Sequence, residues 1–164
     1  MGWTTPSHVV SGADISSAAH NTDVIDNIQY LYDYLPRGYI ASATVTAVQS
    51  SISTVADVTG LTATWTAPAN RRYKMTVLLP VFQNSGAAGT LDVFITTSSN
   101  TAVATSQIQV PASSYAMAHA MVVVAPSAGS ITYKVRMSTS ASTCQTAVAA
   151  TIPGLFLIED IGHT

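Results

Sequence analysis

The feature that most limits the fold of this chain is an alternation of apolar and polar side chains with a period of two residues. Ile131, Tyr133, Val135 and Met137 alternate with polar or charged residues, and residues 91–96 follow a similar pattern. Successive side chains on a β-strand point to opposite faces, so this period predicts strands with one buried and one solvent-facing side.

Turn residues separate these segments from others that have strand composition. Prolines and glycines, among them Pro68, Gly86, Pro111 and Pro153, mark the turns. The predicted strands are residues 43–48, 61–66, 73–82, 91–96, 102–110, 116–124, 131–138 and 147–158, and residues 49–57 fit either a short strand or a loop. Strands in this number with short connections are typical of an antiparallel β-sandwich of the jelly-roll or TNF-like type.

A helical period precedes the strands. Apolar side chains recur at steps of three and four residues, at Val24, Ile25, Ile28, Leu31, Tyr32 and Leu35. This spacing predicts one apolar stripe on an amphipathic helix. Ser16 or Ser17 can cap its first turn, and Pro36 and Gly38 end it. We therefore divide the chain into an N-terminal arm and helix, residues 1–38, and a β-sandwich domain, residues 39–164.

Charged residues are scarce. They make up 9% of the chain, whereas about 25% is usual in soluble domains. A hydrophobic content of 48% argues against disorder, so we expect a folded domain with a neutral surface. Such a surface suits contacts between subunits, because the cores of protein interfaces are depleted of charge.

Charge and hydropathy also narrow the classes of partner. The net charge is −2, and the basic residues are scattered apart from Arg71, Arg72 and Lys74, which we predict to be a solvated strand edge. We therefore expect no nucleic-acid binding. No apolar run approaches the roughly 20 residues of a membrane helix. The N-terminal residues also lack the pattern of a signal peptide, so we expect synthesis and folding in a cytoplasm.

The sequence contains no recognisable catalytic motif. Cys144 lies in a segment rich in Ser, Thr and Ala without an activating neighbour, which predicts a buried or idle thiol. The histidines lack zinc-ligand spacing, and we predict His119 to be a structural or subunit-facing residue on a strand. No loop for phosphate, dinucleotide or calcium is present. We expect a protein that is not an enzyme and that holds no metal or cofactor.

Sugar binding is the main alternative from another class of function. Jelly rolls serve as lectins, and aromatic rings can stack on sugar faces. The candidate aromatics are Trp65, Tyr73, Tyr115 and Tyr133. Trp65 and Tyr133 fall in alternating strands, where packing in the core is the default.

Two segments form a recognisable pattern. Near the start its residues are Trp3, Pro6, Gly12, Ser17-Ala18-Ala19, Asn21, Val24, Asp26-Asn27-Ile28 and Tyr30-Leu31, and near the end it is LFLIEDIG, residues 155–162. The first segment resembles the start of small virion proteins of tailed bacteriophages, particularly those that infect actinobacteria, and the second is similar to the closing strand of such proteins. The resemblance implies a structural role, as a head decoration protein or a tail accessory protein, and implies no catalytic residues.

These observations predict a non-enzymatic virion component, most concretely a homotrimeric head decoration protein that stabilises an assembled capsid. Its expected partners are copies of itself and the major capsid protein or other virion proteins. The alternatives are a minor tail protein and a carbohydrate- or receptor-binding module. The residues predicted to contact another subunit or the shell are Trp3, Val24, Ile28, Leu31, Tyr32 and Leu35.

Overall fold

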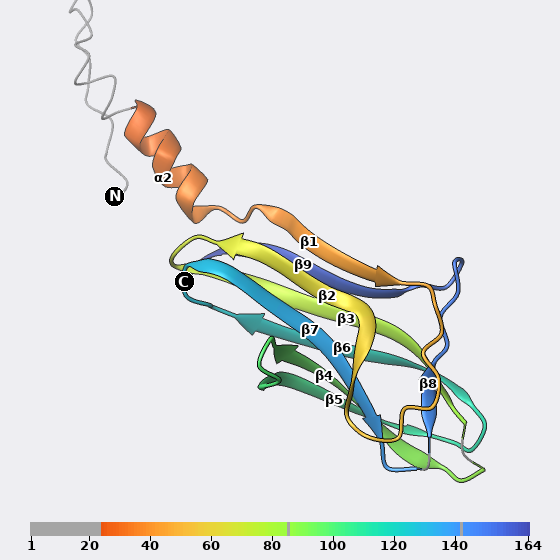
Figure 1. The fold of residues 1–164 in the computed structure, drawn as a ribbon. Coiled ribbons are helices and arrows are strands. Elements are labelled where there is room, and N and C mark those ends of the chain that lie inside the picture. Colours follow the sequence, from red (N-terminus) through yellow and green to blue (C-terminus); the bar gives the residue numbers. More distant parts are fainter. Residues whose placement is uncertain (1–23, 85, 142) are drawn as a thin grey trace, which may run out of the picture.

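The computed structural model describes residues 24–84, 86–141 and 143–164. It shows one short helix followed along the chain by two antiparallel sheets packed face to face (Figure 1). The elements are α2 (Asp26–Tyr34), β1 (Gly38–Val45), β2 (Ala56–Ala67), β3 (Arg71–Gln83), β4 (Gly89–Thr97), β5 (Ala102–Val110), β6 (Tyr115–Val124), β7 (Gly129–Thr139), β8 (Cys144–Thr146) and β9 (Gly154–His163). The predicted fold class, a mainly β antiparallel sandwich preceded by one N-terminal helix, is confirmed.

The strand order is that of a jelly roll. One sheet, which we call sheet A, has the order β1-β9-β3-β6, with the short β8 paired to the end of β3. The other, sheet B, has the order β2-β7-β4-β5. The chain crosses from one sheet to the other at every connection between the long strands except the β4–β5 hairpin. This crossing produces the interlocked Greek keys of the jelly-roll architecture.

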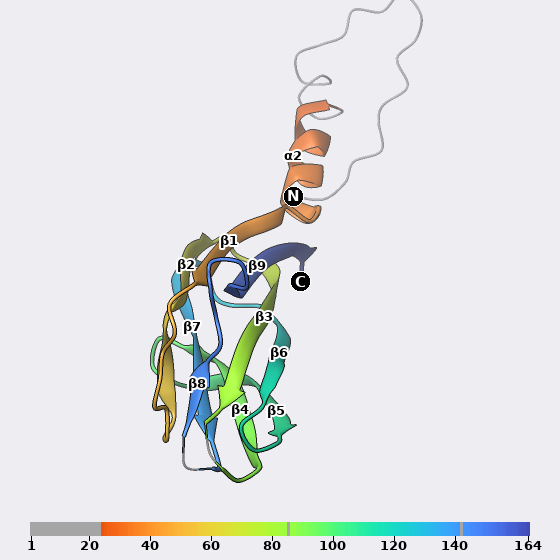
Figure 2. The ribbon, with the colours of Figure 1, turned by 90° about the vertical axis from the view of Figure 1, so that its right-hand side faces the viewer.

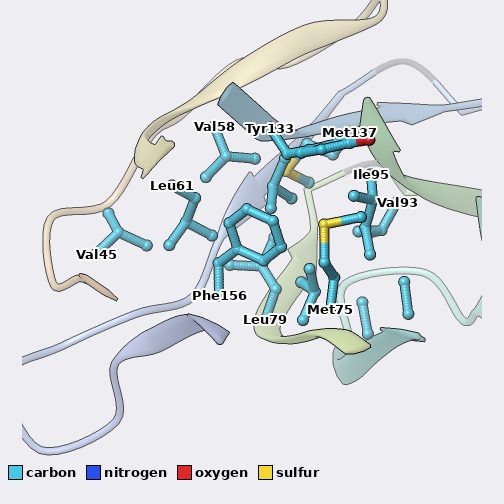
Figure 3. Packing of buried hydrophobic residues seen from close by; sticks show 14 of the residues in the cluster. Val45, Val58, Leu61, Met75, Leu79, Val93, Ile95, Tyr133, Met137 and Phe156 are labelled. Atoms are coloured by element: carbon cyan, nitrogen blue, oxygen red, sulfur yellow. The ribbon is translucent and has the colours of Figure 1, made fainter. Parts of the chain in front are cut away.

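The core lies between the two sheets and is built from the alternating apolar positions. Met75 and Leu79 of β3 face Val93 and Ile95 of β4, and Phe156 of β9 fills the space beside them (Figure 3). All five side chains are fully buried. Each large aliphatic or aromatic side chain removed from water in this way contributes about 1.5–3 kcal/mol, so this layer supplies much of the stability of the fold.

The helix projects beyond one end of the sandwich, where the chain turns from α2 into β1 (Figure 2). Leu35 is extended, with a ψ of 149°, because a residue that precedes proline is disfavoured in the helical region. Gly38, with a φ of +72°, makes the turn into β1 in a conformation that favours glycine. Ser16 and Ser17, the predicted caps, lie outside the described residues.

Several predicted strand limits were wrong. Residues 147–158 do not form one strand, because Pro153 cannot donate to a ladder and the segment before it leaves the sheet. The strands there are β8, which pairs with the last residues of β3 beyond the start of β9, and β9 itself, which runs on to His163. Residues 49–57 form a loop with a bridge between Ile52 and Cys144, followed by the start of β2, while β1 begins earlier than predicted, at Gly38.

Burial of Cys144 leads to a first prediction. Its side chain is fully buried, and burial raises the pKa of the thiol to about 11. Because the thiolate is the reactive form, we expect no reaction with a soluble disulfide reagent at pH 8 in the native state and one equivalent of reaction after denaturation. Absorbance of the released thiol measures both. Rapid reaction of the native protein would contradict the burial of this strand.

Candidate functional site

The apolar stripe of the helix is exposed to solvent. Val24, Ile28, Leu31, Tyr32 and Leu35, five of the six predicted contact residues, are each between 41% and 62% exposed. The sixth, Trp3, lies outside the described residues. Ile28, Leu31 and Tyr32 lie within α2, while Val24 precedes it and Leu35 follows its last residue, so the structure places the five described residues along one short segment.

The end of the helix is held by one arginine. Arg71, at the start of β3, is 1% exposed and pairs with both carboxylate oxygens of Asp160 on β9. Its Nε lies 2.9 Å from Oδ2 and its Nη2 lies 2.6 Å from Oδ1. The same guanidinium donates to the carbonyl oxygens of Asp33 and Leu35 at the end of α2. These carbonyls have no partner within the helix, and they form the negative end of its dipole, so a cation there is favourable.

Two further contacts fit the helix against β9. The ring of Tyr34 stacks on His163, with centroids 4.2 Å apart, and it also stacks on Tyr30. Gly162 has a φ of +110°, and a Cβ at this position would lie 3.3 Å from the carbonyl oxygen of Tyr34. The close approach of the helix end to β9 therefore favours glycine at position 162 on two independent grounds.

A polar cavity of about 320 Å³ lies at this junction, between the helix end and the turn from β2 to β3. Its lining includes Arg37, Asn70, Arg71 and His163. Arg37 stacks over the ring of Tyr32 at 4.4 Å, and its buried Nε has no hydrogen-bond partner. The cavity thus lies beside the contacts that hold the end of the helix against the sandwich.

The described residues contain no metal-binding cluster, and their cysteine is not activated. Within them, no group of three or more His, Cys, Asp or Glu side chains could hold a metal ion. Over the same part of the chain, no helix has the length and apolarity needed to cross a bilayer. Cys144 is buried, as predicted, and its pKa is raised rather than lowered, which is the opposite of what an activated nucleophile needs.

The prediction that the basic trio forms a solvated strand edge was wrong, because β3 lies between β9 and β6 and Arg71 is buried. Arg71 is not part of a solvated edge but lies in the interior, whereas Arg72 is exposed and Lys74 forms a half-exposed ion pair with Glu159 at 2.6 Å. Sequence reasoning missed the pairing of Arg71 with Asp160. The available signal was that the alternation of β3 places Arg71 in phase with the buried Tyr73 and Met75.

The aromatic candidates for sugar stacking fall into two groups. Trp65, Tyr73 and Tyr133 are buried, and the Trp65 ring contacts the other two, with centroids 5.3 Å from Tyr73 and 5.7 Å from Tyr133. The expectation of core packing for Trp65 and Tyr133 is confirmed. Tyr115, at 76% exposed, is the one of the four with a ring accessible to a ligand.

No protein-family model matches this chain, and no curated protein matches it. Among solved structures, a chain of infectious bursal disease virus, Gx strain, is 14% identical with a TM-score of 0.41, covering 77% of this chain and 32% of that one. The CBM22-1–GH10 modules of the Clostridium thermocellum N-terminal endo-1,4-beta-D-xylanase 10B, complexed with xylohexaose, are 11% identical with a TM-score of 0.38, covering 79% and 29%. The enzymatically active domain of bacteriophage CBA120 tailspike protein 4 is 11% identical with a TM-score of 0.26, covering 73% and 19%.

This chain therefore spans about a third or less of the length of each of these structures. At these identities and scores the likeness does not extend beyond the β-sheet architecture.

The ion pair that holds the helix leads to a second prediction. Asp160→Asn leaves the Arg71 guanidinium buried without its counter-charge, and breaking a buried pair in this way costs about 3–5 kcal/mol. We expect the free energy of unfolding, measured by chemical denaturation, to fall by that amount.

Glu159→Gln is the matched control, because Glu159 is the preceding residue of the same strand and pairs with Lys74 at the surface. Exposed pairs contribute at most about 1 kcal/mol, so this variant should lose little stability. Equal losses of unfolding free energy in the two variants would show that the buried Arg71–Asp160 pair matters no more for stability than the surface pair.

Proposed function

We propose that this protein is a non-enzymatic structural component of a tailed-phage virion, and most concretely a homotrimeric head decoration protein that binds and stabilises the assembled capsid. The observation that carries the proposal is the helix: its apolar stripe is exposed, and Arg71 holds its C-terminal end through the carbonyl oxygen of Leu35. Contiguous exposed apolar side chains mark sites of protein association.

Three further features support a structural role. The start of the chain and its closing segment resemble tailed-phage virion proteins, as quoted above. The closing segment forms most of β9, which lies between β1 and β3 in sheet A. The chain also has few charges, which favours close contact with neighbouring subunits in a lattice.

The proposed mechanism is mass action. A protein that binds the assembled lattice but not its separate subunits stabilises the lattice, by about 2.7 kcal/mol per site at a free concentration of 100 times Kd. The anchors for such binding are Ile28, Leu31 and Tyr32 on the helix, because large apolar and aromatic side chains dominate the energy of interfaces. Repeated attachment of an oligomer adds avidity without further chemistry.

A minor tail or tail-accessory protein of similar fold is the alternative placement, with or without a sugar- or receptor-binding surface. The exposed ring of Tyr115 is the observation that favours such a surface. A glycan array decides this point: sugar binding that is lost in Tyr115→Ala would support it, and no binding at millimolar sugar would exclude it.

The direct test locates the protein on virions of the phage that encodes it, by electron microscopy with a labelled antibody. Label spread over the head supports a decoration protein. Label confined to the tail supports the alternative placement. Intact particles that carry no label would overturn a role on the virion surface.

The helix stripe leads to a third prediction. Leu31→Asp places a charge in the centre of the stripe, where contact with a partner would have to desolvate it, so we expect attachment to virions to be lost. The β-sheet circular dichroism should remain, because Leu31 is exposed and contributes nothing to the core. Sedimentation of the variant with purified particles measures attachment.

Gln29→Glu is the control, because it adds the same charge on the opposite side of the helix. Its repulsion from Asp33, four residues later, costs only about 0.2–0.5 kcal/mol. Unchanged attachment of Leu31→Asp would show that the stripe is not the contact surface.

A further inference from the structure

The two outer faces of the sandwich differ in character. We call the side chains of β3, β6 and β9 that point away from the core the sheet A face. It consists of Leu78, Tyr115, Met117, His119, Met121, Val123, Leu155 and Leu157, together with Thr76, Phe82 and, at the end near the helix, Lys74 and Glu159. The strand register places these side chains in adjacent rows, since His119 lies opposite Leu78, which lies opposite Leu155. Residues paired across a sheet share one face, so these side chains form a continuous apolar surface.

On the outer face of sheet B, polar and charged side chains hydrogen-bond to one another. Asp57 accepts from Lys134 at 2.7 Å and from Arg136 at 2.8 Å, and hydrogen bonding to Lys134 is the main cause that lowers the pKa of its carboxyl. Thr64 and Thr132 are hydrogen-bonded at 2.7 Å, and Gln107 donates to Asp92 at 2.8 Å. These groups are satisfied at a surface open to water, so this face needs no cover.

Among the described side chains of β3, β6 and β9 on the sheet A face there is no such network beyond the Lys74–Glu159 ion pair, and the hydrogen bond between Tyr39 and Ser42 lies on the neighbouring β1. Four of its side chains on β6 (Tyr115, Met117, Met121 and Val123) are between 50% and 76% exposed, and Leu78 on β3 is 40% exposed. A patch of large apolar side chains rimmed by polar groups is typical of an association site rather than of a surface that stays in water.

The charges of this face indicate what can cover it. Lys74 and Glu159 lie at the end near the helix and neutralise each other at 2.6 Å. Within the apolar rows of this face, the titratable side chains are those of His119 and Tyr115. A neutral face gives no attraction to a strongly charged partner. It is electrostatically compatible with a second copy of itself, which brings no like charge against it.

The edge of the sheet leads to the same occupant. β6 is the outermost strand of sheet A and runs for ten residues without a lysine, a proline or a bulge. Natural proteins protect exposed edge strands with such features, because an unprotected edge pairs with other chains. In an oligomer of this chain, a neighbouring copy would cover both the edge and the apolar face.

We propose that the sheet A face is the surface through which copies of this chain associate, which leaves the helix stripe free for a different partner. The inference deepens the proposed function and rests on it for the role of the oligomer. The contact itself rests on the apolar rows and the unprotected edge. The molecule then has two apolar surfaces for two partners: sheet A for itself and α2 for the shell.

The test is the oligomeric state of the full chain by sedimentation velocity over a series of concentrations. We expect the wild-type protein to associate. Met121→Lys should weaken association at least about tenfold, because contact would bury an unpaired charge. His119→Lys, two residues away on the same face, is the second variant and should have a similar effect. Both positions are exposed, so circular dichroism should show the folded sheet in each.

Thr105→Lys is the matched control. Thr105 is an exposed residue in the middle of β5, the edge strand of sheet B, so the variant adds the same charge at an equivalent edge. It should associate like the wild-type protein. A wild-type protein that stays monomeric, or folded lysine variants on sheet A that associate as the wild type does, would overturn the inference.

The outcomes separate this inference from the proposed function. Virions that carry the label, together with normal association of Met121→Lys, would retain the proposed function and reject the sheet A contact. Unlabelled virions, together with association that Met121→Lys abolishes, would retain the contact and reject the virion role.

Discussion

Burial of the Arg71 guanidinium constrains the arrangement of everything at the helix end of the molecule. A cation taken out of water must have its donors occupied, and the carboxylate of Asp160 supplies only part of what the guanidinium needs. The carbonyls of Asp33 and Leu35 at the end of α2 accept two further hydrogen bonds, so the helix ends where those carbonyls reach Arg71. This one side chain links β3, β9 and α2. It thereby fixes where the exposed stripe leaves the sandwich.

The surfaces of the molecule follow from where its few charges lie. The charged pairs of sheet B satisfy one another on the outer face, and those near the helix bind the helix end. The helix stripe and the sheet A face therefore have few charged groups that water can solvate. The exception is the half-exposed pair of Lys74 and Glu159 at the end of the sheet. The low total charge therefore leaves two separate apolar surfaces. Each of them is removed from water only by contact with a partner.

Local periodicity predicted most of the fold because the jelly roll buries alternate residues along nearly every strand. Residues 102–110 match β5 at both ends, and 116–124 match β6 to within one residue. The segment 147–158 failed because its apolar content hides a change of partner, from β8 beside β3 to β9 beside β1 and β3. For the candidate site, the stripe on the helix was readable from spacing. The pairing of Arg71 with Asp160 was not, because it joins residues that only the strand order brings together.

The position of β9 also determines when the protein can become competent to associate. β9 lies between β1 and β3, yet it is synthesised after both, together with the carboxylate that pairs with Arg71. Until it leaves the ribosome, β1 and β3 lack their common neighbour and the helix end lacks its anchor. Pairing across so long a sequence separation is also slow. Both apolar surfaces therefore reach their final geometry only after β9 has left the ribosome. The order of the strands along the chain thus delays association until β9 has been synthesised.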